Sequence, residues 1–439
     1  MTIHTKQITL PAGYIVINNK PFDINIMKKK FFNTNIYRNN SATEFIVENG
    51  KITEMGTNLP ECDEEIDLKG KLIMPPYVDP HLHLDYVYTG RNDGGMVNSG
   101  TLFEGIERWH YIKKSQNKKD VKERALAGIR EEVSHGIQFI RTHIDVTDPE
   151  LTGLKAILEL REELKDKVTI QIVSFPQEGM YAYKNGFEMV EEGLKMGADC
   201  VGAIPHFEWA REIGEKSIHK TVELAVKYNK MIDVHIDETD DVMARFIELL
   251  NALVMTEGIG EKTAASHACS FGSADNAYAN RMIGLFKKSK INFITPPTEN
   301  AYLQGRMDNY PKRRGLNRVK ELLDEGINVC FAQDSINDPW YPLGNGNMMN
   351  ILDNGIHLTH MASYQEIEKS FDLITSNCAK TMMIEDYGLT IGKSANFIVL
   401  NESDVFEAIR KRVEVLASVR NGEYLFKRKE PIYDLPLNL

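Results

Sequence analysis

The sequence predicts an α/β protein with a (β/α)₈ TIM-type barrel and a small β-sandwich domain formed by its N- and C-terminal segments. Three observations lead to this prediction. Short apolar strands alternate with amphipathic helical stretches through the middle of the chain, eight such units can be counted there, and β-rich segments flank them on both sides. We therefore expect residues 73–385 to form the barrel, and residues 1–72 and 386–439 to contribute the two parts of the small domain.

The eight strands are expected where short apolar runs precede helical patterns. They are residues 77–84, 138–145, 169–175, 200–206, 231–235, 263–267, 292–296 and 329–334. Helical patterns such as 121–129 and 215–228 lie between them. A doubly wound open sheet is the alternative, but the chain has no glycine-rich fingerprint after its first strand. The pattern therefore favours the closed barrel.

The flanking segments read as strands joined by tight turns. On the N-terminal side the strand-like runs are 14–18, 44–48 and 51–55, and on the C-terminal side they are 396–400, 413–416 and 424–426. Asn49-Gly50 and Asn421-Gly422 are strong hairpin signals. These runs indicate one small β domain built from both ends of the chain.

Composition narrows the classes of partner and compartment. The chain has 439 residues, is 42% hydrophobic and carries a formal net charge of −11, which argues against nucleic acid as a partner. No apolar run reaches the ~18 residues of a membrane span, and the N-terminus lacks the pattern of a signal peptide. The five cysteines are scattered without a Cys-x-x-Cys spacing. We expect a cytoplasmic protein that binds neither nucleic acid nor membrane, and the sequence leaves a homo-oligomer open.

Polar side chains gather at the carboxyl ends of the expected strands. His81 and His83 are separated by one residue, so alternation along a strand places both on one face. A barrel builds its active site from this rim and the loops that follow it. The residues at or just after strand ends are His81, His83, His143, Gln177, His206, His235, His267 and Asp334. Taken singly, His143 and His206 are better explained as hydrogen-bonded structural residues.

Three imidazoles and one carboxylate form a good site for one divalent ion, Zn²⁺ or Fe²⁺. The ligands expected here are His81, His83, His235 and Asp334, which leave a position for water whose pKa the ion lowers towards ~7. His267 is then placed to take or hold the water proton. Glu238 suits a proton shuttle, although a carboxylate in the first turn of a helix explains it equally well.

Longer motifs resemble those of the bacterial cytosine deaminases of the amidohydrolase superfamily, over residues from about 72 to 400. These motifs are far more specific than His-x-His alone. They are DPHLHLD at 79–85, SGTLFEGIERW at 99–109, FPQEG at 175–179, GAIPHFE at 202–208, DVH at 233–235, YPKRRG at 310–315 and DPWYPLG at 338–344.

The resemblance implies a reaction and a role for each site residue. Water adds to the ring carbon that bears the exocyclic amine, ammonia is released, and a uracil-type base is the product. One divalent metal would be held by His81, His83, His235 and Asp334, with His267 orienting the water. Gln177 would read the carbonyl and amide edge of the ring, and Glu238 would carry a proton to the ring nitrogen. The flat base would be walled by Leu102, Phe175 and Trp340.

One departure from the family concerns the substrate. Cytosine deaminases resemble one another in having His-Asp-Asp at the end of strand eight, where this chain has Gln333-Asp334-Ser335. Ser335 is smaller than a carboxylate and neutral, which leaves room for about a methyl group and can shift specificity by ~1–3 kcal/mol. The loop 295–300 also departs. We expect cytosine or a 5-substituted cytosine, 5-methylcytosine first, as substrate, and a plain cytosine deaminase with a tolerated Ser335 has equal weight.

Two alternatives from other classes stay open. The same metal site would serve an amidohydrolase acting on another cyclic amine or amide of the isoguanine, triazine or dihydropyrimidine type. The dihydropyrimidine type is less favoured because strand four lacks the lysine that two-metal relatives carry at its carboxyl end. A non-catalytic metal-binding protein is disfavoured because His267, Glu238 and Gln177 are all present beside the ligands.

Overall fold

A computed structural model describes residues 14–15, 27–91 and 97–429, which form two compact units. The larger unit is Tyr77–Glu385, and the smaller one consists of the described parts of Met1–Pro76 and Asp386–Leu439. Each is described by itself below. No helix in the described part of the chain combines the length and apolarity needed to cross a bilayer.

The larger unit contains eight parallel strands, each hydrogen-bonded to the next in chain order. A parallel bridge between Leu82 and Asp334 joins the first strand to the segment after the last, so the sheet closes on itself. The predicted (β/α)₈ barrel is confirmed. The strands are β6 (Tyr77–Leu82), β7 (Ile137–Asp145), β8 (Thr169–Phe175), β9 (Cys200–Ala203), β10 (Met231–Ile236), β11 (Thr263–His267), β12 (Asn292–Thr295) and β13 (Val329–Phe331).

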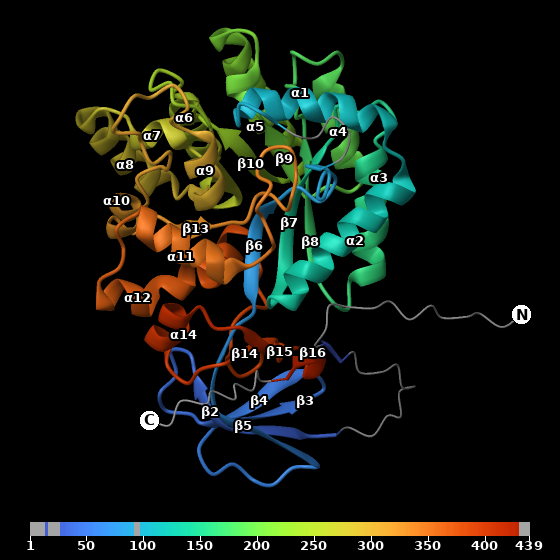
Figure 1. Ribbon diagram of the computed structural model, residues 1–439, viewed down its shortest axis with the longest axis vertical. Coiled ribbons are helices and arrows are strands. Elements are labelled where there is room, and N and C mark those ends of the chain that lie inside the picture. Colours follow the sequence, from blue (N-terminus) through green and yellow to red (C-terminus); the bar gives the residue numbers. More distant parts are fainter. Residues whose placement is uncertain (1–13, 16–26, 92–96, 430–439) are drawn as a thin grey trace, which may run out of the picture. The chain divides into compact units, whose positions relative to one another are not determined.

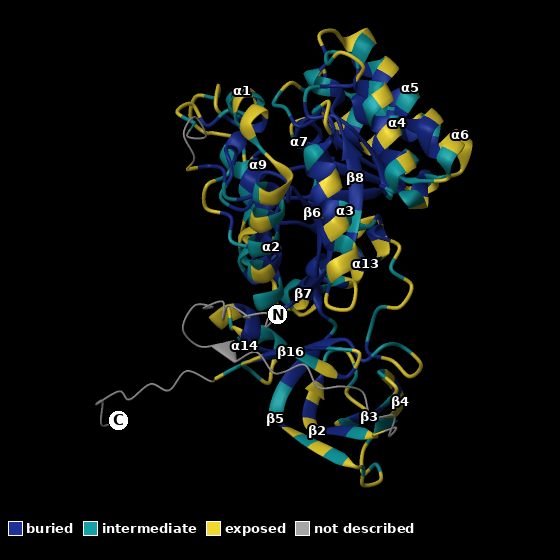
Figure 2. Ribbon diagram, turned by 90° about the vertical axis from the view of Figure 1, so that its right-hand side faces the viewer, coloured by how far each residue is buried: buried dark blue, intermediate teal, exposed yellow. Residues whose placement is uncertain are grey.

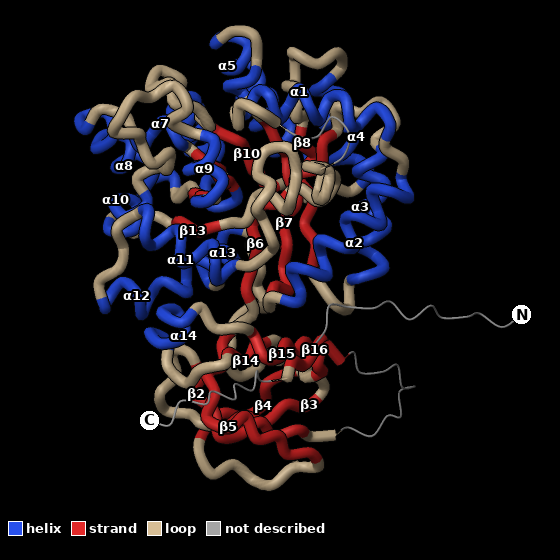
Figure 3. The backbone as a smooth tube through the Cα atoms, in the orientation of Figure 1, coloured by secondary structure: helices blue, strands red, loops and turns tan. Residues whose placement is uncertain are grey.

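Helices surround these strands (Figures 1 and 3). The α-helices are α1 (Leu102–Ile112), α2 (Lys118–Ser134), α3 (Thr152–Leu164), α4 (Gly186–Met196), α5 (Arg211–Tyr228), α6 (Phe246–Glu257), α7 (Cys269–Gly272), α8 (Asn276–Ser289), α9 (Pro297–Leu303), α10 (Val319–Asp324), α11 (Met348–Leu358), α12 (Tyr364–Ser370) and α13 (Ser376–Thr381). Short 3₁₀ turns are η1 (Lys113–Ser115), η2 (Pro205–Phe207), η3 (Gly260–Lys262) and η4 (Phe371–Ile374).

The barrel strands are buried on both faces, as expected for a parallel sheet covered by helices (Figure 2). Every residue of β6 and β7 is buried. Four strands, β6, β9, β12 and β13, end earlier than predicted, and β9 shows why. Pro205 cannot donate to a strand ladder and begins η2, so the strand stops at Ala203. His206 therefore lies in a 3₁₀ turn after the strand.

The smaller unit is a mixed sheet to which both chain ends contribute, as predicted. Its order is β1-β16-β15-β14-β5-β2-β3-β4, and only β2 and β5 pair in parallel. The strands are β1 (Tyr14–Ile15), β2 (Lys29–Ile36), β3 (Glu44–Glu48), β4 (Lys51–Gly56), β5 (Glu64–Met74), β14 (Phe397–Leu400), β15 (Val415–Arg420) and β16 (Glu423–Arg428), with helix α14 (Val405–Lys411) between β14 and β15. The rest of the strand expected at 14–18 lies outside the described residues.

The sheet of the smaller unit curls around an aromatic core. Phe45 on β3 and Phe397 on β14 lie three strands apart in the sheet order, yet their ring centroids are 5.3 Å apart. Phe31 on β2 contacts both rings. The predicted hairpin turns are also present, with Asn49 and Gly50 both in the left-handed backbone region that such a turn requires.

Candidate metal centre and substrate pocket

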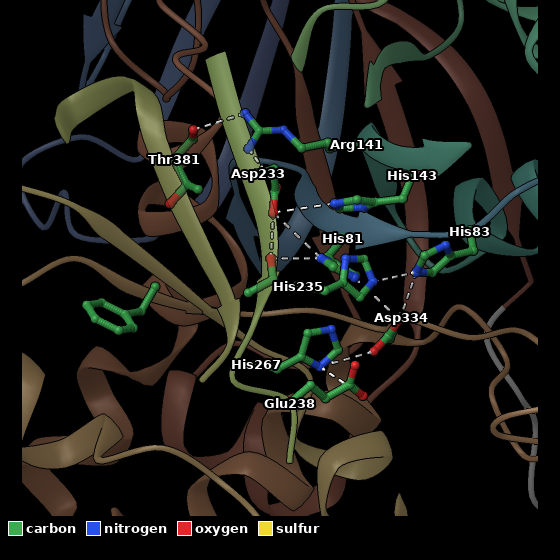
Figure 4. A network of polar contacts seen from close by, with 12 residues as sticks. His81, His83, Arg141, His143, Asp233, His235, Glu238, His267, Asp334 and Thr381 are labelled. Carbon is green, nitrogen blue, oxygen red and sulfur yellow. Dashed lines mark hydrogen bonds and ion pairs between the residues drawn. The ribbon is translucent and has the colours of Figure 1, made fainter. Parts of the chain in front are cut away.

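Closure of the barrel brings the four predicted metal ligands together (Figure 4). The Asp334 N–H donates to the His81 carbonyl at 2.9 Å, which seats the end of the last strand beside the first. Asp334 Oδ1 then lies 3.5 Å from His81 Nε2 and 3.4 Å from His83 Nε2. His83 Nε2 is 3.1 Å from His235 Nε2. Ligand atoms from the first, fifth and eighth strand regions thus converge on one point.

Two of the converging residues have an uncommon backbone conformation. His267 and Asp334 have φ values of 68° and 69°, in the left-handed region that non-glycine residues rarely adopt. Such a conformation costs about 1–3 kcal/mol and is concentrated at functional sites. The chain turns sharply at both residues, where β11 ends and just after β13.

The donor set fits a divalent metal ion. The pKa values of His81 and His235 lie well below the usual value, mainly because both rings are buried and secondly because other imidazoles are close. Both rings are therefore neutral and can offer lone pairs. His81 Nε2 and Asp334 Oδ2 are buried without a hydrogen-bond partner among the described residues. Burial and the nearby carboxyls of Glu238 and Asp338 raise the pKa of Asp334. A cation at this point would accept the lone pairs and offset the carboxylate charge.

A second group of ligand atoms overlaps the first. In each of two sets of side chains, the ligand atoms all lie within 4.8 Å of one another. One set is His81, His235, His267 and Asp334, and the other is His81, His83 and His143. His143 Nε2 is 3.4 Å from Asp233 Oδ1, and Figure 4 shows this pair on the side of the ligand cluster opposite Glu238.

A buried polar network holds the ring of His81. The Ser266 hydroxyl lies 2.9 Å from His81 Nδ1 and donates to Asp233 Oδ1 at 2.6 Å. Arg141, 1% exposed, donates to Asp233 Oδ2 at 3.0 Å and to the Thr381 carbonyl at 3.1 Å (Figure 4). Burial by itself would raise the pKa of Asp233, but His143 and Arg141 hold it below the usual value. The network fixes the ring of His81 with Nε2 turned to the ligand cluster.

Glu238 and His267 lie together on the other side of the ligands. His267 Nδ1 is 3.5 Å from Glu238 Oε1 and 2.9 Å from the side-chain nitrogen of Asn300. Burial raises the pKa of Glu238 to about 8. The alternative explanation of Glu238 as a helix-start carboxylate does not apply, because α6 begins only at Phe246. His206 Nε2 is 4.0 Å from Glu238 Oε2, so this histidine also lies beside the site.

A small pocket of about 260 Å³ opens onto the ligands. Its lining includes most of the residues predicted from the sequence. The predicted residues in the lining are His83, Leu102, Gln177, His235, Glu238, His267, Asp334, Ser335 and Trp340. Tyr86 and Glu299 also line the pocket. Phe175 was predicted to wall the base, but it does not line the pocket and stacks on the His235 ring with centroids 4.2 Å apart. His81 also lies behind the lining.

One wall of the pocket depends on a close approach of α1. The Trp340 indole N–H donates to the Leu102 carbonyl at 3.2 Å. A Cβ at position 105 would lie 2.4 Å from that indole nitrogen, so only glycine fits there. Gly105 thus allows Leu102 and Trp340 to form one apolar wall.

Tyr86 and Glu299 were missed by reasoning from the sequence. Tyr86 is 2% exposed, and its hydroxyl donates to Gln177 Oε1 at 3.1 Å. Glu299 is 3% exposed in the first turn of α9. Neither stands at a strand end, and a carboxylate in a first helical turn is a common stabilising feature. The only hint was that Glu299 belongs to the loop 295–300, which departs from the family pattern.

Comparison with known proteins places the chain in one family. The pattern of the Amidohydrolase family matches residues 64–426. A crystal structure of 5-methylcytosine deaminase from Klebsiella pneumoniae, liganded with 5-fluorocytosine, superposes with a TM-score of 0.89 at 43% identity and covers 93% of this chain and 99% of that chain. N-isopropylammelide isopropyl amidohydrolase from Pseudomonas sp. (strain ADP) is 29% identical over 83% of this chain and 88% of that protein. The chain belongs to the amidohydrolase family.

Proposed function

We propose that this protein is a metal-dependent hydrolytic deaminase that converts cytosine or a 5-substituted cytosine, 5-methylcytosine first, to the corresponding uracil-type base and ammonia. The observation that carries the proposal is one small pocket lined by His83, His235 and Asp334 together with Glu238 and Gln177. Similarity to a 5-methylcytosine deaminase at 43% identity supports the same substrate class.

The ligands His81, His83, His235 and Asp334 would hold one Zn²⁺ or Fe²⁺, since nitrogen and oxygen donors together suit these ions. Such an ion supplies a water of lowered pKa and polarises the reacting centre. We assign His267 to the proton of the attacking water, and its ring lies against both Glu238 and Asp334. These contacts place the proton-handling groups on one side of the pocket.

Glu238 carries a proton to the ring nitrogen beside the attacked carbon. Its carboxyl is buried, and burial raises its pKa to about 8, near neutral pH, where a carboxyl can both take up and release a proton. Gln177 reads the carbonyl and amide edge of the ring. Because Tyr86 donates to Gln177 Oε1, the amide group keeps its N–H donors for the ligand. Leu102 and Trp340 enclose the flat base.

Ser335 is the residue we assign to the 5-position. It lines the pocket next to the ligand Asp334 and is 1% exposed. A hydroxyl in place of the carboxylate that the family resemblance implies leaves volume for about one methyl group. Room for one methyl group more or less changes the discrimination between two substrates that differ by that group by about 1–3 kcal/mol.

Steady-state kinetics test the proposal. Turnover is measured as ammonia release with cytosine, 5-methylcytosine and isoguanine, as isopropylamine release with N-isopropylammelide and as ring opening with dihydrouracil, using protein loaded with Zn²⁺ or with Fe²⁺. We expect the highest kcat/KM with a cytosine and little turnover of the other rings. A kcat/KM for cytosine far above that for 5-methylcytosine would remove the special role of Ser335. Preferred turnover of a triazine, detected through the alkylamine that it releases, would refute the proposed function.

A further inference from the structure

Glu299 is a buried carboxyl that faces the pocket without a cationic partner. It reaches the pocket from the first turn of α9, which follows β12, and its side chain is almost fully buried. Its Oε2 atom has no hydrogen-bond partner among the described residues. In the part of the chain that the structure describes, no Lys, Arg or His nitrogen lies within 4 Å of its carboxyl oxygens. A buried carboxyl left in this state costs free energy unless a ligand satisfies it.

The other carboxyls and the amide oxygen of the lining each have a neighbour or a role that Glu299 lacks. Asp334 belongs to the ligand cluster, and Glu238 lies against His267 and His206. Gln177 Oε1 accepts the Tyr86 hydroxyl. Among the carboxyls of the described lining, Glu299 is therefore the one that neither belongs to the ligand cluster nor has a histidine nitrogen within 4 Å, and its Oε2 has no hydrogen-bond partner.

The surroundings of Glu299 place it beside the expected ligand Asp334. Its electrostatic neighbours are Asp334, Asp338 and Glu238, and the Ser335 hydroxyl interacts with it. Asp338 does not compete for the ligand, because its Oδ1 accepts the backbone N–H groups of Trp340 and Tyr341. Glu299 thus belongs to the Asp334 side of the pocket, where the attacked carbon and its exocyclic substituent must lie.

We propose that Glu299 accepts a hydrogen bond from the exocyclic amino group of the substrate and so selects a ring with an unsubstituted amine at the attacked carbon. This rests on the proposed deaminase function and adds a residue to it. An amino group brings two N–H donors to a wall that holds an unpaired acceptor. A carbonyl oxygen at the same position brings none, so the carboxyl favours the substrate over the uracil-type product.

The test compares leaving groups in the wild type and in Glu299→Met, which keeps side-chain length but removes both oxygens. One substrate is the cytosine that the wild type prefers, and the other is its analogue with a methoxy group in place of the amine. Hydrolysis of the analogue consumes one water and releases methanol and the same uracil-type base. We expect kcat/KM for the amine to fall by about 10- to 100-fold and kcat/KM for the methoxy analogue to stay within about 3-fold. Glu299→Gln, which retains one acceptor oxygen, should lose less than Glu299→Met.

A second readout does not need turnover of the analogue. Inhibition by the uracil-type product should not weaken in Glu299→Met, because the product offers that wall no N–H donor. Thr298→Val, a change at the neighbouring position of the same turn, is the matched control and should keep both substrates within about 3-fold. Thermal unfolding of each variant confirms that it is folded.

The outcomes separate this proposal from the proposed function. Equal losses with both leaving groups, or a product that binds more weakly, would assign Glu299 a structural role only. An unchanged kcat/KM for the amine in Glu299→Met would overturn the proposal while leaving the deaminase function intact. A wild type that releases ammonia from no cytosine would refute the proposed function and this assignment with it.

Discussion

His83 Nε2 and His235 Nε2 lie 3.1 Å apart, although the two residues are 152 positions apart in the sequence. Both rings are buried, and burial lowers the pKa of both well below the usual value. Two neutral imidazoles turn nitrogen atoms of the same kind towards one point, together with Asp334 Oδ1 at 3.4 Å from His83. The arrangement explains why a cation is expected between them.

His235→Ala should abolish metal binding and activity together. Elemental analysis of the purified wild type should find about one divalent ion per chain, and the variant less, because one of the four expected donors is lost and the ion is bound more weakly. Adding metal to 100 times its dissociation constant should stabilise the wild type by about 2.7 kcal/mol, but not the variant. The control is His219→Ala, at an exposed position of α5. Full activity of His235→Ala would contradict the ligand set.

The convergence of the four expected ligands could be predicted from the sequence because barrel geometry converts strand order into spatial order. His81, His235 and Asp334 each stand at a strand end, and a closed parallel sheet brings all strand ends to one rim. The bridge from Leu82 to Asp334 that closes the sheet lies beyond the end of β13 at Phe331. Strand ends are set by local features such as Pro205, and periodicity locates them only approximately.

The residues that line the pocket were harder to predict from the sequence, because the lining depends on side-chain directions in loops. Tyr86 reaches Gln177 from a turn after β6, and Glu299 enters from a short helix. Neither position carries a pattern that separates a ligand contact from an ordinary loop residue. Phe175 illustrates the converse, since the end of β8 turns its ring against His235 and away from the pocket lining.

Ser335→Asp should shift specificity away from 5-methylcytosine. The longer, charged side chain fills volume beside the ring and adds a carboxyl next to Glu299 and Asp338. We expect the ratio of kcat/KM for 5-methylcytosine to that for cytosine to fall by about 10- to 100-fold, the size of effect expected for one methyl group. Ser335→Ala serves as the control and should keep the ratio. A ratio unchanged in Ser335→Asp would remove Ser335 from the 5-position.

Tyr86→Phe should weaken substrate binding more than the chemical step. The change removes the hydroxyl that donates to Gln177 Oε1 and leaves the ring in its contact with Trp340, whose centroid is 4.6 Å away. A released amide can rotate, so its N–H donors are no longer directed at the ligand. A lost hydrogen bond of about 1 kcal/mol should raise KM about 5-fold, with kcat nearly constant. Gln177→Leu should show a larger rise, and a fall in kcat alone for Tyr86→Phe would argue against this role.

Arg141→Met should destabilise the fold by about 3–5 kcal/mol, because it leaves the buried carboxylate of Asp233 without its cation. Urea unfolding measures the loss. Combining it with Asp233→Asn removes the stranded charge, so the double variant should be more stable than Arg141→Met alone. Lys118→Met breaks a solvent-exposed pair with Glu159 and should change the free energy of unfolding by less than about 1 kcal/mol. Equal stabilities of the single and double variants would exclude this charge compensation.

His206 should contribute to loss of stability in acid. Burial lowers the pKa of its imidazole from 6.5 to about 3, so the folded protein keeps the ring neutral where the unfolded chain binds a proton. The free energy of unfolding therefore falls by about 1.4 kcal/mol per pH unit from this group as the pH drops below 6.5. In His206→Gln that contribution vanishes, so its stability relative to the wild type should rise steadily between pH 6.5 and 4.5. His219→Gln, at an exposed position, should run parallel to the wild type, and a His206→Gln difference that does not change with pH would refute the assignment.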